Sequence, residues 1–180
     1  KNIIQSLVPS VTRLGTEYKG KSVPDGCCSF PLITHNRKKL FGWDAKFSIL
    51  GRYTLTQRDY QKQMSYIKWF KTTPLTKKMG SLRIYSIVSN STSIGNLQTV
   101  LQKLAICRTK PRNCRIILIQ DLILCNLGEW MLSNWKKVIA KGPQISLSFF
   151  QWLLTKTTRK RVTYCLNTDW DSLKGILDAL

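Results

Sequence analysis

The sequence predicts a single α+β domain: a mixed or mainly antiparallel sheet, three to four helices and an extended N-terminal arm. Segments with the period-two alternation or the continuous apolar runs of strands alternate along the chain with segments whose apolar residues recur every three or four positions, as in amphipathic helices. The chain has 180 residues, 43% of them hydrophobic, and six tryptophans. This is enough apolar material for one buried core, so the chain is folded rather than a basic disordered tail.

Residues 1–45 are rich in glycine and proline and show little periodicity. We therefore expect an extended arm and loops there, followed by a basic α+β domain over residues 46–180. The first expected strand lies in KFSILGRYTLT, residues 46–56, because its apolar residues share one face and its basic and hydroxyl residues mostly share the other. Those apolar residues are Phe47, Ile49, Tyr53 and Leu55.

The next three elements follow from clear periodic patterns. A helix is predicted where Tyr60, Met64 and Ile67 recur at helical spacing, and Pro74 marks its end. A strand fits residues 81–89, and the polar residues 90–95 turn the chain into another helix. The apolar positions of that helix are Leu97, Val100, Leu101 and Leu104.

A basic loop, residues 108–115, leads into the apolar run IILIQDLILC, residues 116–125. This run is most easily placed as a central strand covered on both faces, although its period alone leaves a buried helix open. We expect Asp121 within it to be buried and paired with Arg115 or a backbone amide. The apolar positions between residues 127 and 139 then predict an amphipathic helix that Gly142 and Pro143 stop.

The C-terminal third is predicted to hold a hairpin and a helix. QISLSFFQWLL (144–154) has the composition of a strand, KTTRKR (156–161) that of a basic turn, and VTYCL (162–166) that of the partner strand. Asn167 or Thr168 is expected to cap a final helix whose first turn carries Asp169 and Asp171. Its apolar side consists of Trp170, Leu173, Ile176, Leu177 and Leu180.

Charge is the strongest functional signal. The chain has 29 Lys and Arg against 9 Asp and Glu, a formal net charge of +20. Such an excess favours a polyanionic partner, RNA or ribonucleoprotein or an anionic membrane surface, rather than a small-molecule substrate. Cations on loops and helix ends can each meet a phosphate and add salt-dependent affinity. The residues expected to do so are Arg37, Lys38, Lys39, Lys77, Lys78, Arg108, Lys110, Arg112, Lys156, Arg159, Lys160 and Arg161.

Aromatic residues and cysteines add further expectations. Trp69 and Phe70 lie beside lysines, so exposed rings there are candidates for stacking on bases or dipping into a lipid interface. Six cysteines without two close Cys or His pairs favour reduced core thiols over a zinc site. Reduced thiols, no apolar run of 18 residues and an N-terminal segment too short and too polar for a signal peptide predict a protein that is neither transmembrane nor secreted. We expect it to be intracellular, in a virion interior or the cytoplasm, with an organelle or the nucleus also open, and a targeting segment upstream of Lys1 stays open as well.

Signals for catalysis are few. Paired acids occur as Asp169 and Asp171, where helix capping is a sufficient explanation and a nuclease metal pair is the alternative. None of the common nucleotide-binding, zinc-protease or serine-hydrolase motifs is present. We therefore expect no enzymatic activity, no cofactor and no metal.

Three stretches between residues 41 and 89 carry a resemblance: FGWDAKFSILGRYTL, then YIKWF, then KKMGSLRIYSIVS. In order and rough spacing they are similar to the core of rhabdovirus-type matrix proteins. The resemblance implies a non-enzymatic viral structural protein that condenses ribonucleoprotein, associates with the anionic inner membrane leaflet and self-associates as a homo-oligomer.

Two other classes of function stay open. A ribosomal or mitoribosomal RNA-binding protein would share the charge, the size and the N-terminal arm. A metal-dependent nucleic-acid-processing enzyme needs an acidic cluster to hold its metal, and the sequence by itself does not assemble one.

Overall fold

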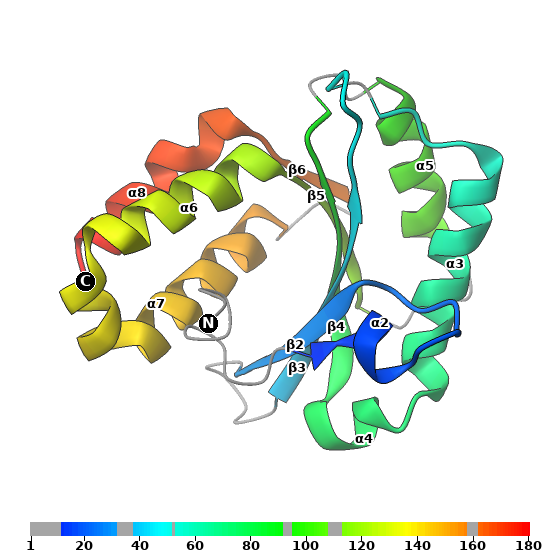
Figure 1. Ribbon diagram of the computed structural model, residues 1–180, viewed down its shortest axis with the longest axis horizontal. Coiled ribbons are helices and arrows are strands. Elements are labelled where there is room, and N and C mark those ends of the chain that lie inside the picture. Colours follow the sequence, from blue (N-terminus) through cyan, green and yellow to red (C-terminus); the bar gives the residue numbers. More distant parts are fainter. Residues whose placement is uncertain (1–11, 32–37, 52, 92–94, 108–112, 158–161) are drawn as a thin grey trace.

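Six strands form one mixed sheet in the order β1-β2-β3-β4-β5-β6 (Figure 1). The structure is a computed structural model that describes residues 12–31, 38–51, 53–91, 95–107, 113–157 and 162–180. The first three strands pair antiparallel, and β3 to β6 pair parallel. This confirms the predicted α+β domain with a mixed sheet. The strands are β1 (Thr12–Arg13), β2 (Gly26–Pro31), β3 (Lys38–Lys46), β4 (Ser81–Ser89), β5 (Arg115–Gln120) and β6 (Val162–Cys165).

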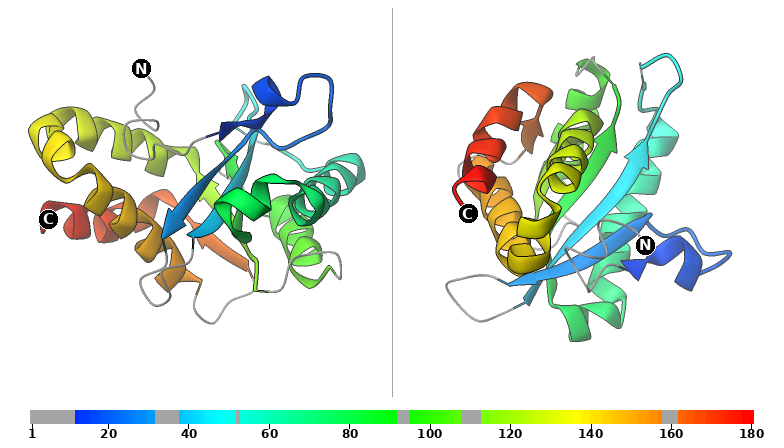
Figure 2. Two further views of the ribbon diagram at one scale, coloured as in Figure 1. Left: turned by 90° about the horizontal axis from the view of Figure 1, so that it is seen from below. Right: turned by 60° about the vertical axis from the view of Figure 1, so that its left-hand side comes forward.

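Helices cover both faces of the sheet (Figure 1, and from two further directions Figure 2). One layer holds α2 (Leu14–Glu17), α3 (Gln57–Thr72), α4 (Leu75–Met79) and α5 (Gly95–Ile106). The other holds α6 (Asp121–Ser133), α7 (Trp135–Lys156) and α8 (Trp170–Asp178), with a short 3-10 helix, η1 (Asn167–Asp169), before α8. The described residues thus contain seven α-helices, more than the three to four expected. None of these helices has both the length and the apolarity to cross a bilayer.

The sheet separates two hydrophobic cores. In β4, Tyr85 and Ile87 pack with α3 and α5, whereas Ile84 and Val88 pack with the α6–α7 layer. In β5, residues 116–119 are all buried, and their sequence IILI is a continuous apolar run, as in parallel sheets covered by helices.

Residues 12–45 differ from the expected arm and loops, since they supply β1, β2 and most of β3. The strand expected over residues 46–56 is wrong. β3 ends at Lys46, and residues 47–51 and 53–56 form no strand. β3 lies inside the sheet with residues buried on both faces, so its sequence KKLFGWDAK has no simple alternation. The alternating residues Phe47 and Ile49 are exposed on the loop that follows it. Residues 1–11 lie outside the described part of the chain.

The apolar run 116–125 is a strand only as far as Gln120, because α6 begins at Asp121. Asp121 is half-buried, and its Oδ1 accepts a hydrogen bond from the amide of Leu122. The single helix expected over residues 127–139 is also wrong, because the chain turns at Asn134 between α6 and α7.

The strand predicted over residues 144–154 is instead the second half of α7, which continues beyond Pro143. Lys141, at φ −126° and ψ 21°, breaks the helical path just before that proline. Pro143 therefore stands in the first turn of a new helical stretch, where its missing N–H is tolerated. The hairpin is wrong as well, since β6 pairs parallel with β5.

Four elements agree closely with the sequence patterns: α3, β4, α5 and α8. Each has one clearly buried side or a short run bounded by turn residues. Of the apolar side expected for α8, Leu173 and Leu177 are buried, whereas Ile176 is largely exposed.

Candidate functional site

Two charged side chains of β3 point from the sheet toward α3. Along the strand, Trp43 packs into the core beneath α6 and α7, so the alternating side chains of Asp44 and Lys46 lie on the opposite face. Both residues stand at the carboxyl end of β3. In open sheets with parallel strands, ligands bind at the carboxyl ends of the strands.

Asp44 is the centre of a buried hydrogen-bond network. Its carboxylate is 2% exposed, and Oδ2 accepts from Lys46 Nζ at 2.8 Å and from Gln63 Nε2 at 2.5 Å. Gln63 Oε1 accepts in turn from the Tyr85 hydroxyl at 2.5 Å. Gln63 and Tyr85 are fully buried, so the hydroxyl holds the amide of Gln63 with its donor end toward Asp44.

The antiparallel pairing of β2 and β3 brings Asp25 next to the carboxyl end of β3, close to Asp44. Asp25 precedes Gly26, which lies opposite Trp43, and its Oδ2 accepts from the amide of Ala45 at 2.7 Å. A Cβ at Gly26 would overlap the indole ring of Trp43. The absence of a side chain at Gly26 thus lets Trp43 pack against β2 directly beside Asp25.

The environment of Asp25 disfavours its charged form. Burial raises the pKa of this carboxyl, and the neighbouring Asp44 raises it further, although the Ala45 amide and Lys46 act in the opposite direction. For Lys46, burial alone would lower the pKa, but the hydrogen bond and charge of Asp44 outweigh it and the pKa is raised. Two carboxyl groups therefore share one firmly protonated lysine.

A third carboxylate lies within electrostatic range of Lys46. Asp59 forms a capping box with Thr56 at the start of α3 and accepts from the Tyr53 hydroxyl at 3.2 Å. Burial acts to raise the pKa of Asp59, yet the hydrogen bonds from Thr56 and Tyr53, with the charge of Lys46, lower it. All nine acidic residues of this chain fall in its described part, and three gather here.

An open groove runs beside the start of α3. It is lined by the capping pair Thr56 and Asp59, by polar Ser22 and Gln61, and by Arg58 and Lys62. Asp59 belongs both to the groove lining and to the charged surroundings of Lys46, whereas Asp25 and Asp44 do not line the groove. Its two cations suit a phosphate backbone.

The carboxylate pair matches the ligands that Mg²⁺ uses in proteins. Mg²⁺ is commonly held by one or two carboxylates, with waters and substrate phosphates completing its octahedral shell. Across the described residues, no three His, Cys, Asp or Glu side chains are grouped to hold an ion. Asp25 and Asp44 would thus form an open site rather than a closed protein cage.

The structure brings together four of the cations expected to bind phosphate. Lys38 and Lys39 begin β3, and Lys77 and Lys78 lie in α4, which packs against the same end of the sheet. Lys39 Nζ donates to Ser81 Oγ at 3.0 Å, and the other three are exposed. This group lies at the opposite end of β3 from Asp44. Arg37, Arg108, Lys110, Arg112, Arg159, Lys160 and Arg161 fall outside the described residues.

Lys156 is engaged within the fold. Its Nζ is 2.5 Å from Asp169 Oδ1 and lies over the ring of Trp152. Asp169 also accepts from the amide of Leu166 at 2.9 Å. This acid thus caps the 3-10 helix η1 and forms an ion pair. The expected capping of the final helix by Asn167 or Thr168 is wrong, because both lie in η1 and Asp169 is the N-cap residue of α8, without a side-chain hydrogen bond there.

The prediction that the rings of Trp69 and Phe70 are exposed is wrong. Phe70 is 1% exposed in the core, and Trp69 is half-buried, packing edge-on against Tyr18 at 5.4 Å. The reason is that α3 turns its apolar stripe, which includes Phe70, toward the sheet. The largely exposed rings are instead Phe47 and Trp135.

None of the six cysteines is joined to another in a disulfide. Cys165 is buried as a small hydrophobic residue, whereas Cys125, expected to be buried too, is exposed on α6. This follows from the helical course of residues 121–133, which turns one side of the apolar run to solvent.

The carboxylate pair was missed because its residues are distant in sequence and its strand was taken for a loop. Asp44 and Lys46, two apart at the end of the segment KKLFGWDAK, were the available signal. Comparison of the chain with family models, with curated proteins and with solved structures finds no match.

Proposed function

We propose that this protein is a metal-dependent nucleic-acid-processing enzyme that hydrolyses phosphodiester bonds. The observation that carries the proposal is the contact of Asp25 and Asp44 beside Lys46, in a chain of net charge +20. The chain's cations attract a polyanion, and the carboxylate pair supplies the acidic cluster that the sequence did not assemble.

In the proposed reaction, Asp25 and Asp44 would hold Mg²⁺, and the ion would supply Lewis-acid activation of the scissile phosphate and of a water molecule. The water oxygen bonds to phosphorus as the bond to one ester oxygen breaks. The attacking water releases a proton to solvent, and the leaving alkoxide takes a proton from solvent. The products are a phosphomonoester end and an alcohol end, so no oxidant or further reactant is needed.

Lys46 has an electrostatic role in this scheme. Its raised pKa keeps it protonated at neutral pH, which excludes it as the general base. As a fixed cation beside the carboxylates, it stabilises the negative charge that develops on the phosphoryl oxygens. Arg58 and Lys62 would hold the flanking phosphates in the groove.

The test is cleavage of end-labelled single-stranded and duplex DNA and RNA by the purified chain, with Mg²⁺, Mn²⁺ or EDTA. We expect cleavage with a divalent ion and none with EDTA. Asp44→Asn and Lys46→Met should each reduce the rate at least about a hundredfold, because each removes a charge used in the transition state.

Lys156→Met and Asp169→Asn are the matched controls, because they disrupt another Lys–Asp pair of similar length. They should keep wild-type cleavage. Equal activity in Asp44→Asn and wild type, or no cleavage of any of the four substrates with either metal, would refute the proposal.

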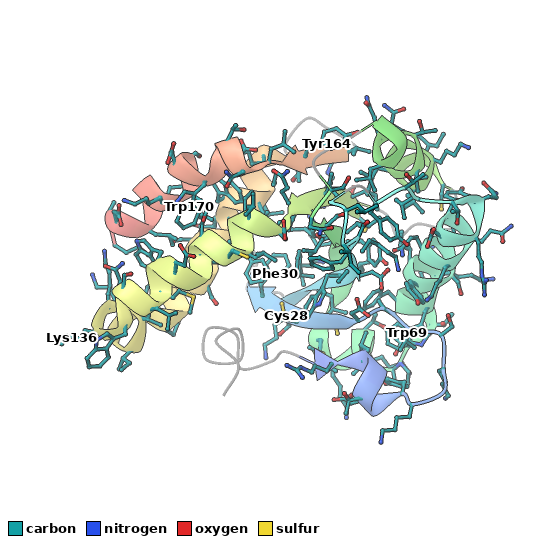
Figure 3. All side chains as sticks on the ribbon, turned by 45° about the horizontal axis from the view of Figure 1, so that its top comes forward. Cys28, Phe30, Trp69, Lys136, Tyr164 and Trp170 are labelled. Atoms are coloured by element: carbon teal, nitrogen blue, oxygen red, sulfur yellow. The ribbon has the colours of Figure 1, made fainter. Side chains whose placement is uncertain are left out.

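A second candidate, the matrix-like function, is favoured by the turn between α6 and α7. Leu132, Trp135 and Ile139 are 64%, 56% and 75% exposed there, and Lys136 Nζ lies 5.8 Å from the Trp135 ring centre. Figure 3 shows Lys136 at the end of the helix pair far from the sheet. An exposed tryptophan with aliphatic and lysine neighbours suits the interface of an anionic membrane. In this function the chain bridges ribonucleoprotein and membrane and self-associates.

Sedimentation with phosphatidylserine vesicles tests the second candidate. Wild type should sediment in low salt and less in high salt, and Trp135→Ser with Ile139→Ser should lose most of the binding. The same changes at Phe47 and Ile49, also exposed, serve as the control. Wild type that stays in solution at every salt concentration would exclude the membrane function while leaving the hydrolytic one intact.

A further inference from the structure

We infer that a cavity between the sheet and the α6–α7 helix pair binds a hydrocarbon group, either a small apolar ring or the end of an acyl chain. The cavity has a volume of about 120 Å³. Its walls come from Cys28, Phe41 and Val88 on the sheet and from Leu127, Ile145 and Phe150 on the helices. This inference stands independently of the carboxylate pair, which lies on the opposite face of β3.

The size and the walls of the cavity point to an apolar occupant. Protein cores are packed with few voids larger than a water molecule, so a space of this volume is unusual. A buried water needs two to four polar partners, and in the described lining only the Ser146 hydroxyl and the Trp43 indole N–H are side-chain groups with a polar nitrogen or oxygen. Engineered apolar cavities of roughly 150 Å³ stay dry and bind benzene, which sets the scale of ligand expected here.

The space has its origin in the sequence of α7. The helix path is broken at Lys141, and two small residues, Gly142 and Ser146, follow one turn apart. Of these two residues, Ser146 lines the cavity. A larger aliphatic side chain at Ser146 would fill the gap against the sheet.

The cavity opens to solvent on one side. Trp43, Leu124 and Phe149 in its lining are partly exposed, whereas Ile145 and Phe150 are buried. Figure 3 places Cys28 and Phe30 on the side of β2 that faces α7 and Trp69 on the other side of the sheet. A ligand can thus enter past Trp43 without separating the two layers.

Titration of the full chain with benzene and, separately, with octanoate tests the inference, by NMR of the Val88 methyl and Trp43 indole signals. We expect saturable shifts with at least one probe. Benzene alone would identify a free small apolar ligand, and octanoate would identify an acyl chain. Ser146→Leu should fill the space and weaken binding at least tenfold. Ser148→Leu, on the same helix but outside the lining, should bind as wild type.

If Ser146→Leu does not fold, Val88→Leu narrows the cavity from the sheet and should weaken binding at least threefold. The inference is overturned by the absence of saturable shifts with both probes. It is also overturned if a folded Ser146→Leu or Val88→Leu protein binds them as tightly as wild type.

Discussion

Gln63 donates a hydrogen bond of 2.5 Å to Asp44, and this contact joins α3 to the carboxyl end of β3. Both side chains are buried, and the Tyr85 hydroxyl fixes the amide from behind. A buried carboxylate is costly unless its oxygens are paired. The three residues therefore hold Asp44 in place inside the fold, while Asp25 faces solvent next to it.

Gln63→Leu should destabilise the protein by about 1–3 kcal/mol. Leucine fills a similar volume, but it leaves the Tyr85 hydroxyl without its acceptor and removes a donor from Asp44. Urea unfolding measures the change. Gln61→Leu, on the exposed side of the same helix, should alter stability by less than about 0.5 kcal/mol. Equal stability of the two variants would show that the network contributes nothing.

Asp25→Asn should be at least as stable as wild type at pH 7 in EDTA, although it cannot hold the metal. The folded-state pKa of Asp25 lies above its ordinary value, so its contribution to stability is present at low pH and is lost as pH rises through that pKa. Melting temperatures from pH 3.5 to 7 measure this. Mg²⁺ should then raise the melting temperature of wild type alone.

Asp59→Asn should change stability with pH in the opposite direction to Asp25→Asn. The pKa of Asp59 is lowered, so its contribution is present above its ordinary pKa and is lost as pH falls toward the folded value. The variant should be less stable than wild type at pH 7, and the difference should shrink in acid. The same pH trend in both variants would contradict the two opposite pKa shifts.

Gly80→Ala should be far more damaging than Gly20→Ala. Both glycines have positive φ, 96° and 77°, but a Cβ at Gly80 would overlap the Lys38 carbonyl, whereas one at Gly20 would meet no atom within 4 Å. We expect Gly20→Ala to cost about 1–2 kcal/mol through backbone strain alone. The extra loss of stability in Gly80→Ala, measured by urea unfolding, reports the clash of the new Cβ with the Lys38 carbonyl, where the end of α4 approaches β3 closely. Equal losses of stability in the two variants would contradict this close approach.

The cysteines should react in order of exposure. Burial raises the pKa of Cys27 and of Cys165 to about 12, so their thiolates are scarce at neutral pH, whereas Cys125 is exposed. Mass spectrometry after brief N-ethylmaleimide treatment should find Cys125 modified and the other two protected until urea is added. Early modification of Cys27 or Cys165 would contradict their burial.

Sequence patterns predicted the elements whose burial is one-sided or whose ends carry turn residues. The helical spacing of Tyr60, Met64 and Ile67 in α3 and the polar residues around β4 are examples. They did not predict β3, because a strand covered on both faces loses its alternation. They also misassigned residues 144–154, where aromatic and branched side chains favour a strand but packing between α6, α8 and the sheet makes a helix.

The carboxylate pair depends on pairing that no local pattern contains. Asp25 and Asp44 are 19 residues apart, and they meet because Gly26 lies opposite Trp43 in the register of β2 and β3. Charge composition predicts a polyanionic partner, whereas the grouping of three of the nine acids around Lys46 follows from the fold.

Paramagnetic broadening by Mn²⁺ tests the central claim most directly. Titrated into the labelled chain with an uncleavable oligonucleotide, Mn²⁺ should first broaden the amide signals around Asp25, Asp44 and Ala45. Excess Mg²⁺ should restore them, and Asp44→Asn should abolish the effect. Selective broadening centred instead on Asp169 and Asp171, or no selective broadening at all, would contradict a metal site at the end of β3.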